Sequence, residues 1–190
     1  MRAVSDSELV RKAIGGDERA FARIVGDHHG MVFSVVRAIL GNRDDVEDTV
    51  QDIFIKVYRN LARFRGESKL STWIYRIAHN ESINAVKRVR NDHGPLDEAF
   101  GLGTDRGNPD RAHRIRKMRE TLEQLMLELD EQYRVVLELR YMGEKSYIEI
   151  TEIMDIPIGT VKTYIHRAKA ALKAGLTARE RSLEVKGRLS

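Results

Sequence analysis

The sequence contains no cysteine, which excludes disulfide bonds and thiolate metal sites and fits a reducing compartment. Proline is scarce, with three residues in 190, whereas strong helix formers such as Leu, Ala, Glu, Arg and Lys are plentiful. No apolar run approaches the ~20 residues needed to span a bilayer, and the first residues lack the apolar stretch of a signal peptide. We therefore expect an all-α protein of the cytoplasm, without membrane insertion.

The overall composition permits a packed, nucleic-acid-binding protein but does not demand one. Apolar residues make up 42% of the chain, which is enough for a core and argues against general disorder. The formal net charge is +4 and the pI is near 9.4, a balance that suits nucleic acid as a partner only weakly. Because 190 residues can form one domain or two small ones, the arrangement of the residues along the chain has to decide.

Apolar residues in the N-terminal half recur at the spacing of amphipathic helices. One helix is expected from Asp17 to Gly41, with a candidate break at Gly30. The next helix, which Asp44 or Asp45 would cap, has its apolar residues at steps of four, three, four and four along one face. These apolar residues are Val46, Val50, Ile53, Val57 and Leu61.

Residues 63–70 interrupt this spacing and indicate a loop, after which Ser71 or Thr72 is expected to cap a helix that runs to Val89. The apolar pattern then disappears between Asn91 and Asn108, where Gly and Pro recur as they do in flexible linkers. We therefore predict two small helical domains. Their expected ranges are 1–90 for the first domain, 91–112 for the linker, 113–176 for the second domain and 177–190 for a basic, frayed tail.

The second domain has the pattern of a helix-turn-helix. Ser146 can cap a short helix, a tight turn follows, and Pro157 suits the first turn of a helix that starts near Ile158. The outer side of this last helix carries hydroxyl and basic residues, which can contact phosphates and base edges in a major groove. A solvated basic face on an ordinary bundle is the alternative, but no acidic residue lies between Pro157 and Gly175. The candidate duplex-reading residues are Thr160, Lys162, Thr163, His166, Arg167 and Lys169.

The helix that begins near Asp44 is acidic at its start. Carboxylates in a first turn stabilise a helix through its dipole, and this explanation covers the first turn only. Gln51 and Asp52 lie further along the helix, so a docking surface for a basic partner is an equally good interpretation.

Basic and aromatic residues are mixed in the loop and helix that follow. Positive charge follows a nucleic-acid backbone, aromatic rings stack on bases and amides read base edges, and Asn80 and Asn84 share one helical face. This combination favours single-stranded or partly opened DNA over a closed duplex, although Trp73 is more simply explained as a core residue. The basic residues are Arg63, Arg65, Lys69, Arg76, Lys87, Arg88 and Arg90, and the aromatic ones are Phe64, Trp73 and Tyr75.

Two groups of segments resemble the two regions of one protein family. The segments DVEDTVQDIF, FRGES and TWIYRIA, at 45–54, 64–68 and 72–78, are similar to region 2 of extracytoplasmic-function (ECF) RNA polymerase sigma factors. The segments at 133–141, 146–147, 156–162 and 166–168 are similar to region 4 of the same family. The regions occur in the family's order, and together they cover nearly the whole chain except the linker and the tail.

The resemblance implies a bacterial sigma factor, a non-catalytic subunit that gives core RNA polymerase promoter recognition and DNA opening. Region 2 would dock on the clamp helices of the largest polymerase subunit through Asp48, Gln51, Asp52 and Phe54. Region 4 would contact the flap of the second-largest subunit and read the −35 element with the duplex-reading residues named above. By matching position, the residues that capture and open the −10 element would be Arg65, Ser68, Lys69, Arg76, Asn80, Asn84, Lys87 and Arg88.

The resemblance also implies that the partners are core polymerase, promoter DNA and an anti-sigma factor that could hold the protein at the membrane; no cofactor is expected. Three positions depart from the family's usual pattern. Thr151 stands where a small Ala is common, and Thr163-Tyr164 replaces a frequent Ser-Arg pair, so one arginine that usually contacts phosphate is missing. These departures leave the promoter preference open.

Three other classes of protein could in principle share parts of this pattern. A stand-alone helix-turn-helix regulator would explain the second domain equally well, but it leaves the basic and aromatic segment of the first domain unexplained. A helical adaptor would need a mainly acidic surface, and an enzyme would need a catalytic motif, yet no nucleophile elbow, Gly-rich phosphate loop or HExxH is present. Catalytic and metal-binding residues are therefore not expected. The histidines, which lack a metal-ligand spacing, are His28, His29, His79, His93, His113 and His166.

Overall fold

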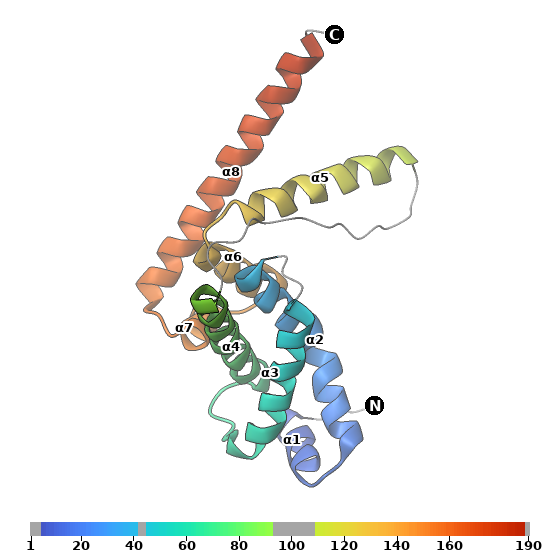
Figure 1. Cartoon of the computed structure of the whole chain (residues 1–190), viewed down its shortest axis with the longest axis vertical. Coiled ribbons are helices and arrows are strands. Elements are labelled where there is room, and N and C mark those ends of the chain that lie inside the picture. The colour runs from blue at the N-terminus through green and yellow to red at the C-terminus, as the bar shows by residue number, and fades with distance from the viewer. Residues whose placement is uncertain (1–4, 42–44, 93–108, 189–190) are drawn as a thin grey trace.

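The computed structural model describes residues 5–41, 45–92 and 109–188, and in these ranges the regular elements are helices, without a strand. The predicted all-α fold is thus confirmed. Figure 1 shows α2, α3 and α4 running side by side, with α5 and the long α8 diverging at the end opposite α1. The helices are α1 (Asp6–Ile14), α2 (Glu18–Leu40), α3 (Val46–Asn60), η1 (Leu61–Arg63), α4 (Leu70–Asp92), α5 (Pro109–Leu127), α6 (Glu131–Leu137), the π-helical turn η2 (Glu138–Met142), α7 (Tyr147–Met154) and α8 (Ile158–Arg188).

The first domain is a bundle of α1 to α4 around the apolar stripes that the sequence predicts. Ile24 of α2, Ile53 of α3 and Ile74 of α4 are completely buried in its core. The predicted break at Gly30 is wrong, because α2 is continuous from Glu18 to Leu40. Gly30 lies on the exposed side of the helix, and one glycine costs about 1 kcal/mol relative to alanine, which the packing of the buried face offsets.

Two predicted helix caps in the first domain differ from those observed. Asp45 occupies the N-cap position of α3, but its side chain makes no capping hydrogen bond, and Asp44 lies outside the described residues. The helix α4 begins at Leu70, earlier than a cap at Ser71 or Thr72 allows. Its first amide, that of Leu70, donates to the carboxylate of Asp6 at 3.3 Å, so the cap comes from the start of α1.

The second domain contains the predicted helix-turn-helix in α7 and α8. Ser146 and Glu149 form a reciprocal capping box at the start of α7. Asp155 adopts a left-handed conformation with a φ of 54°, which ends α7 and aims the chain toward α8. The local signals in the sequence were therefore sufficient to place this motif.

The ends of the second domain are more helical than predicted. We expected a frayed tail from residue 177, yet α8 continues to Arg188, and Arg179 joins this part of α8 to α5. The Arg179 guanidinium donates to the Thr121 carbonyl at 3.1 Å, to Gln124 at 3.0 Å and to Glu128 at 2.7 Å. The predicted linker is also shorter at both ends, since α4 reaches Asp92 and α5 starts at Pro109. Residues 93–108, the remainder of that linker, lie outside the described residues.

The two domains share one apolar core. Val136 and Leu139 of the α6–η2 segment and Ile150 of α7 are buried in the same cluster as the core residues of α2 and α4. Buried Arg134 adds a polar link, because its Nε donates to the Ala38 carbonyl of α2 at 2.7 Å. The contact between the domains was left open by the sequence, and it is extensive in the structure. In the described ranges, no helix is both long and apolar enough to span a membrane.

Candidate nucleic-acid interface

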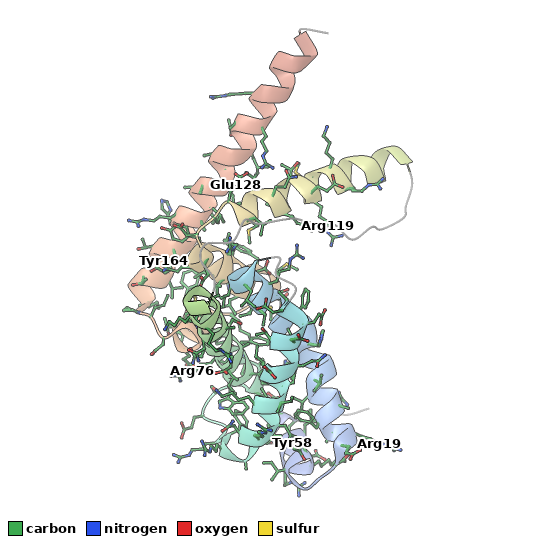
Figure 2. All side chains as sticks on the ribbon, viewed as in Figure 1. Arg19, Tyr58, Arg76, Arg119, Glu128 and Tyr164 are labelled. Atoms are coloured by element: carbon green, nitrogen blue, oxygen red, sulfur yellow. The ribbon has the colours of Figure 1, made fainter. Side chains whose placement is uncertain are left out.

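One side of α4 presents polar and basic residues to solvent. Arg76, Asn80 and Asn84 follow each other at steps of four, and Lys87 and Arg88 continue the row, so the five side chains share one surface, here called the α4 face. All five are exposed, and Figure 2 labels Arg76 among them. The opposite side, with Ile74, Ala78 and Ala85, is buried. The structure therefore brings together most of the residues that the sequence assigned to the −10 element.

Neighbouring residues that the sequence analysis missed orient the amides of the α4 face. Glu81 forms an ion pair with Lys56 of α3 and also accepts a hydrogen bond from the Asn84 amide at 3.4 Å. This places the Asn84 side chain relative to two helices. His79 lies between the domain core and this face, and burial lowers the pKa of His79 below its ordinary value, so it is neutral at pH 7.

The loop before α4 holds the other predicted −10 residues. Arg65 is exposed beside Gly66, whose φ of 73° gives the turn its left-handed conformation. Phe64 and Trp73 are half-buried and pack on each other with ring centroids 5.6 Å apart, which supports a core role for Trp73. Ser68 donates to the Lys69 carbonyl at 3.4 Å, and Lys69 forms an ion pair with Glu149 of the second domain at 3.1 Å.

The predicted duplex-reading residues lie on the outer side of α8, which we call the α8 face: Thr160, Lys162, Thr163, His166, Arg167 and Lys169. All are exposed except Thr160, which is half-buried. The Thr163 hydroxyl donates to the Gly159 carbonyl at 2.8 Å. The neighbouring Tyr164, labelled in Figure 2, is half-buried and packs edge-on against Tyr133 at 5.4 Å, so this residue supports α8 on α6 instead of adding charge.

The predicted docking residues divide into two groups. Asp48, Gln51 and Asp52 are exposed on α3, whereas Phe54 is only 7% exposed, with its ring stacked on His29 at 6.1 Å. Next to them a groove of about 630 Å³ lies between α2 and α3. Its exposed apolar residues are Ile55 and Tyr58, and Tyr58, labelled in Figure 2, packs on Phe21 at 4.9 Å.

In the described part of the chain, no group of three or more His, Cys, Asp or Glu side chains is placed to hold a metal ion. The polar residues that join the two domains, among them Arg134, Lys145 and Glu149, were missed by the sequence analysis. Only Ser146 was identified there, as a helix cap, and a cap predicts a helix start but not a partner.

Fold and surfaces together define a two-domain helical DNA-binding protein of the kind used in transcription. The sequence matches the family Sigma-70 region 2 over residues 24–91 and the family Sigma-70, region 4 over residues 119–172. The chain belongs to the sigma-70 family of RNA polymerase sigma factors, in its ECF group. The presence of both regions in order disfavours a stand-alone helix-turn-helix regulator.

Relatives of similar length support this assignment. The chain is 36% identical over 176 residues to the ECF RNA polymerase sigma factor SigW of Bacillus subtilis, which covers 88% of this chain and 94% of the relative. It is 34% identical over 178 residues to the ECF RNA polymerase sigma-E factor of Escherichia coli K12, covering 89% and 93%. These relatives are transcription initiation factors rather than enzymes.

Solved structures share the fold. CnrH in complex with the cytosolic domain of CnrY is 26% identical with a TM-score of 0.64, covering 91% of this chain and 97% of CnrH. The sigma factor RpoE in complex with the anti-sigma factor NepR from Bartonella quintana has a TM-score of 0.69 at 23% identity, covering 83% and 96%. The second likeness concerns the fold alone.

Proposed function

We propose that this chain directs core RNA polymerase to promoters and begins DNA opening, with no catalysis of its own. The α4 face reads and opens the −10 element, and the α8 face reads the −35 element. The observation that carries this proposal is the exposed row of Arg76, Asn80 and Asn84 on α4, with Lys87 and Arg88 beyond it.

The chemistry of the α4 face suits unpaired bases. An amide offers both a donor and an acceptor to a base edge, and only a base outside the stack presents its pairing edge to a side chain. Arg76, Lys87 and Arg88 supply the positive charge that holds the phosphate backbone beside the amides. Arg65 and Ser68, in the loop before α4, would receive a base that leaves the stack.

The chemistry of the α8 face suits a closed duplex. Its residues project from the second helix of a helix-turn-helix, which is the element that enters a major groove. Lys162, Arg167 and Lys169 can contact phosphates or guanine edges, and Thr160 lies at the helix start, where backbone N–H groups attract phosphate. With Tyr164 packed inward, recognition on this side relies on fewer charges than the family pattern supplies.

Docking on the polymerase is assigned to the exposed residues Asp48, Gln51 and Asp52 of α3. Together with the adjacent apolar groove, they match a helical partner that has basic residues beside an apolar stripe. Phe54 contributes by fixing α3 against α2, since it is buried. The helix-turn-helix domain would contact the flap of the second-largest subunit.

We further propose that an anti-sigma factor controls the protein. Support comes from solved structures of similar fold, one of which holds a sigma factor and its anti-sigma factor. The chain would act in the cytoplasm, where polymerase and promoters are found, and a membrane-anchored anti-sigma factor could hold it at the membrane.

The test is run-off transcription with purified chain and core polymerase on genomic promoter fragments. The expected result is transcripts that start at defined positions and that core alone does not produce. Absence of specific initiation, together with absence of binding to core, would contradict the proposed function. Binding of the isolated chain to closed promoter duplex with high affinity would instead favour a stand-alone regulator.

A further inference from the structure

A cavity of about 580 Å³ lies between α2 of the first domain and the helices α5, α6, η2 and α8 of the second. Its volume is in the range of small-molecule binding sites, which is about 300–1,000 Å³. Of the residues assigned to promoter DNA or to polymerase docking, only Lys169 borders it. The proposed function therefore leaves this cavity unexplained.

The wall of the cavity is largely apolar and partly open to water. Leu122 of α5, with Tyr141 and Met142 of η2, are exposed large apolar side chains in this wall. Met118, also exposed, lies one helical turn before Leu122 and extends the same side of α5. Exposed apolar side chains that gather at one place, instead of lying scattered, mark binding sites. An apolar ligand would remove this area from water.

The cavity has a surplus of positive charge. Its cations are Arg37, Arg119, Arg134 and Lys169, and its carboxylates are Glu123 and Glu138. Arg119, labelled in Figure 2, lies 3.9 Å from the Glu123 carboxylate, and the charge of Arg37 acts on Glu138. The Lys169 ammonium lies over the Tyr141 ring at 5.8 Å. Four cations with two carboxylates leave room for an anion in the cavity.

Arg134 is the cation that most needs such an anion. Its side chain is buried, with the residue only 8% exposed, and it lines the cavity. Its Nε donates to the Ala38 carbonyl at 2.7 Å, and its Nη1 donates to the Leu127 and Leu129 carbonyls at 2.9 and 3.0 Å. Carbonyls at the end of α5 carry partial negative charge only. Among the residues that the structure describes, no carboxylate forms an ion pair with Arg134, so an anion beside it would stabilise a buried charge.

We propose that this cavity binds a single-chain amphiphile with a carboxylate head, such as a medium-chain fatty acid. The chain lies on the apolar wall at Leu122 and Tyr141, and the head faces Arg37 and Arg134. An acidic amphipathic helix has suitable charge as well, but a helix is about 10–12 Å wide, whereas the guanidinium of Arg134 is buried between helices. The inference goes beyond the proposed function, because it requires neither polymerase nor DNA.

Calorimetric titration of the full-length chain with sodium dodecanoate, kept below the concentration at which it forms micelles, tests the proposal. We expect saturable binding at one site. Decanoate and then octanoate should each bind about tenfold more weakly than the next longer chain, because each buried methylene contributes about 0.8 kcal/mol. Dodecyltrimethylammonium, which has the same chain and a positive head, should not bind at this site.

Two substitutions separate the charged and the apolar parts of the site. Arg37→Gln should lower dodecanoate affinity about tenfold, whereas Arg23→Gln makes the same change on the same helix, at an exposed residue outside the cavity, and should have no effect. Leu122→Trp should fill part of the cavity and weaken binding of all three chain lengths. Leu122 is exposed, and circular dichroism should show unchanged helix content in each variant. Arg134 is not substituted, because its loss would remove three hydrogen bonds to the backbone.

Absence of saturable dodecanoate binding, or equal binding of the positively charged amphiphile, would overturn the proposal. So would equal affinities of the Arg37→Gln and Arg23→Gln chains. Binding to phosphatidylglycerol vesicles or to an acidic helical peptide, without binding of free dodecanoate, would assign the surface to another partner and would also overturn it. Failure of the proposed function would appear separately, as absence of promoter-specific transcription with core polymerase.

Discussion

The two candidate DNA-facing surfaces differ in how close they lie to the contact between the two domains. On the α8 face, Lys162, His166 and Arg167 are exposed and lie on the outer side of the helix-turn-helix. At the start of α4, by contrast, Thr72 is buried and Lys69 is paired with a carboxylate of α7. Both surfaces are exposed, but only the first part of the −10 surface borders on the contact between the domains.

This difference has a physical reason. The buried side chains of α7 and α8 point into the shared core. Packing of the second domain on the first therefore leaves the α8 face exposed and places α7 against α4. Substitutions on the α8 face should therefore leave the α4 face unchanged, and substitutions on the α4 face should leave the α8 face unchanged.

The largest effect is expected from the double variant Asn80→Ala and Asn84→Ala. Because each amide contact to a base is worth about 1–3 kcal/mol, promoter opening should fall about 100-fold or more while binding to core is retained. Permanganate reactivity of unpaired thymines measures opening, and Gln132→Ala, an exposed amide on α6, is the control. Loss of core binding in the double variant would show that the α4 face binds core polymerase and not DNA.

The next largest effect is expected from Lys162→Ala with Arg167→Ala. Loss of two phosphate contacts should weaken binding of the polymerase complex to a −35 duplex about tenfold and lower the salt slope by about 1.8. Single-strand binding by the chain should stay the same. A loss of single-strand binding equal to the loss of duplex binding would contradict the separation of the two surfaces.

The contact between Glu149 of α7 and the start of α4 should respond to acid. Although burial raises the pKa of Glu149, hydrogen bonds from Ser146 and Lys69 and the charge of Lys145 lower it further, to about 2 from an ordinary 4.5. A depressed pKa of the Glu149 carboxyl stabilises the packing of α7 on α4 above pH 4.5, and this contribution is lost as the pH falls from 4.5 toward 2.

We expect the fraction of chains with separated domains to rise by no more than about tenfold at pH 3.5. The hydrogen bonds between Ser146 and Glu149 lie within the second domain, so they persist when the domains separate and keep the pKa of Glu149 partly lowered. The distance between labels on Arg19→Cys and Ala174→Cys, at exposed positions in the two domains, gives the measurement, because the sequence has no other cysteine. The labelled chain with Glu149→Gln should respond less to pH than the labelled chain without it. Equal pH responses would assign the effect to other carboxyls.

The smallest effect concerns the crossing of α5 and α8. A Cβ at Gly175 would lie 2.3 Å from a methyl carbon of buried Leu125, so Gly175→Ala should destabilise the chain by about 1–2 kcal/mol through overpacking. Urea unfolding measures this loss, and combining Gly175→Ala with Leu125→Ala should give a total loss smaller than the sum of the two single losses. An additive loss in the double variant would argue against direct contact at the crossing.

How much the sequence could predict depended on whether the signals were local. Ser146, Pro157 and the apolar spacing of α8 lie within the helix-turn-helix, and they placed it correctly. The start of α4 was misplaced because its first amide is capped by Asp6, from the other end of the domain. The tail was misjudged because Arg179 binds residues of α5.

For the candidate site as well, local patterns were predictable and contacts between distant parts of the sequence were not. The α4 face could be predicted because helical periodicity alone sets which residues share a side. The role of Glu149 could not, because its second oxygen binds residues of α4 and the loop before it, far away in the sequence. Phe54 was assigned to docking from its position in a motif, and only the packing against His29 reveals its burial.

The most direct test of the account is the distance between labels at positions 19 and 174 in the isolated chain and in its complex with core polymerase and promoter DNA. We expect a short distance in the isolated chain and a distance tens of ångströms longer in the complex, because the −10 and −35 elements are about 25 base pairs, or about 85 Å of duplex, apart. The same short distance in a complex that initiates transcription would contradict it.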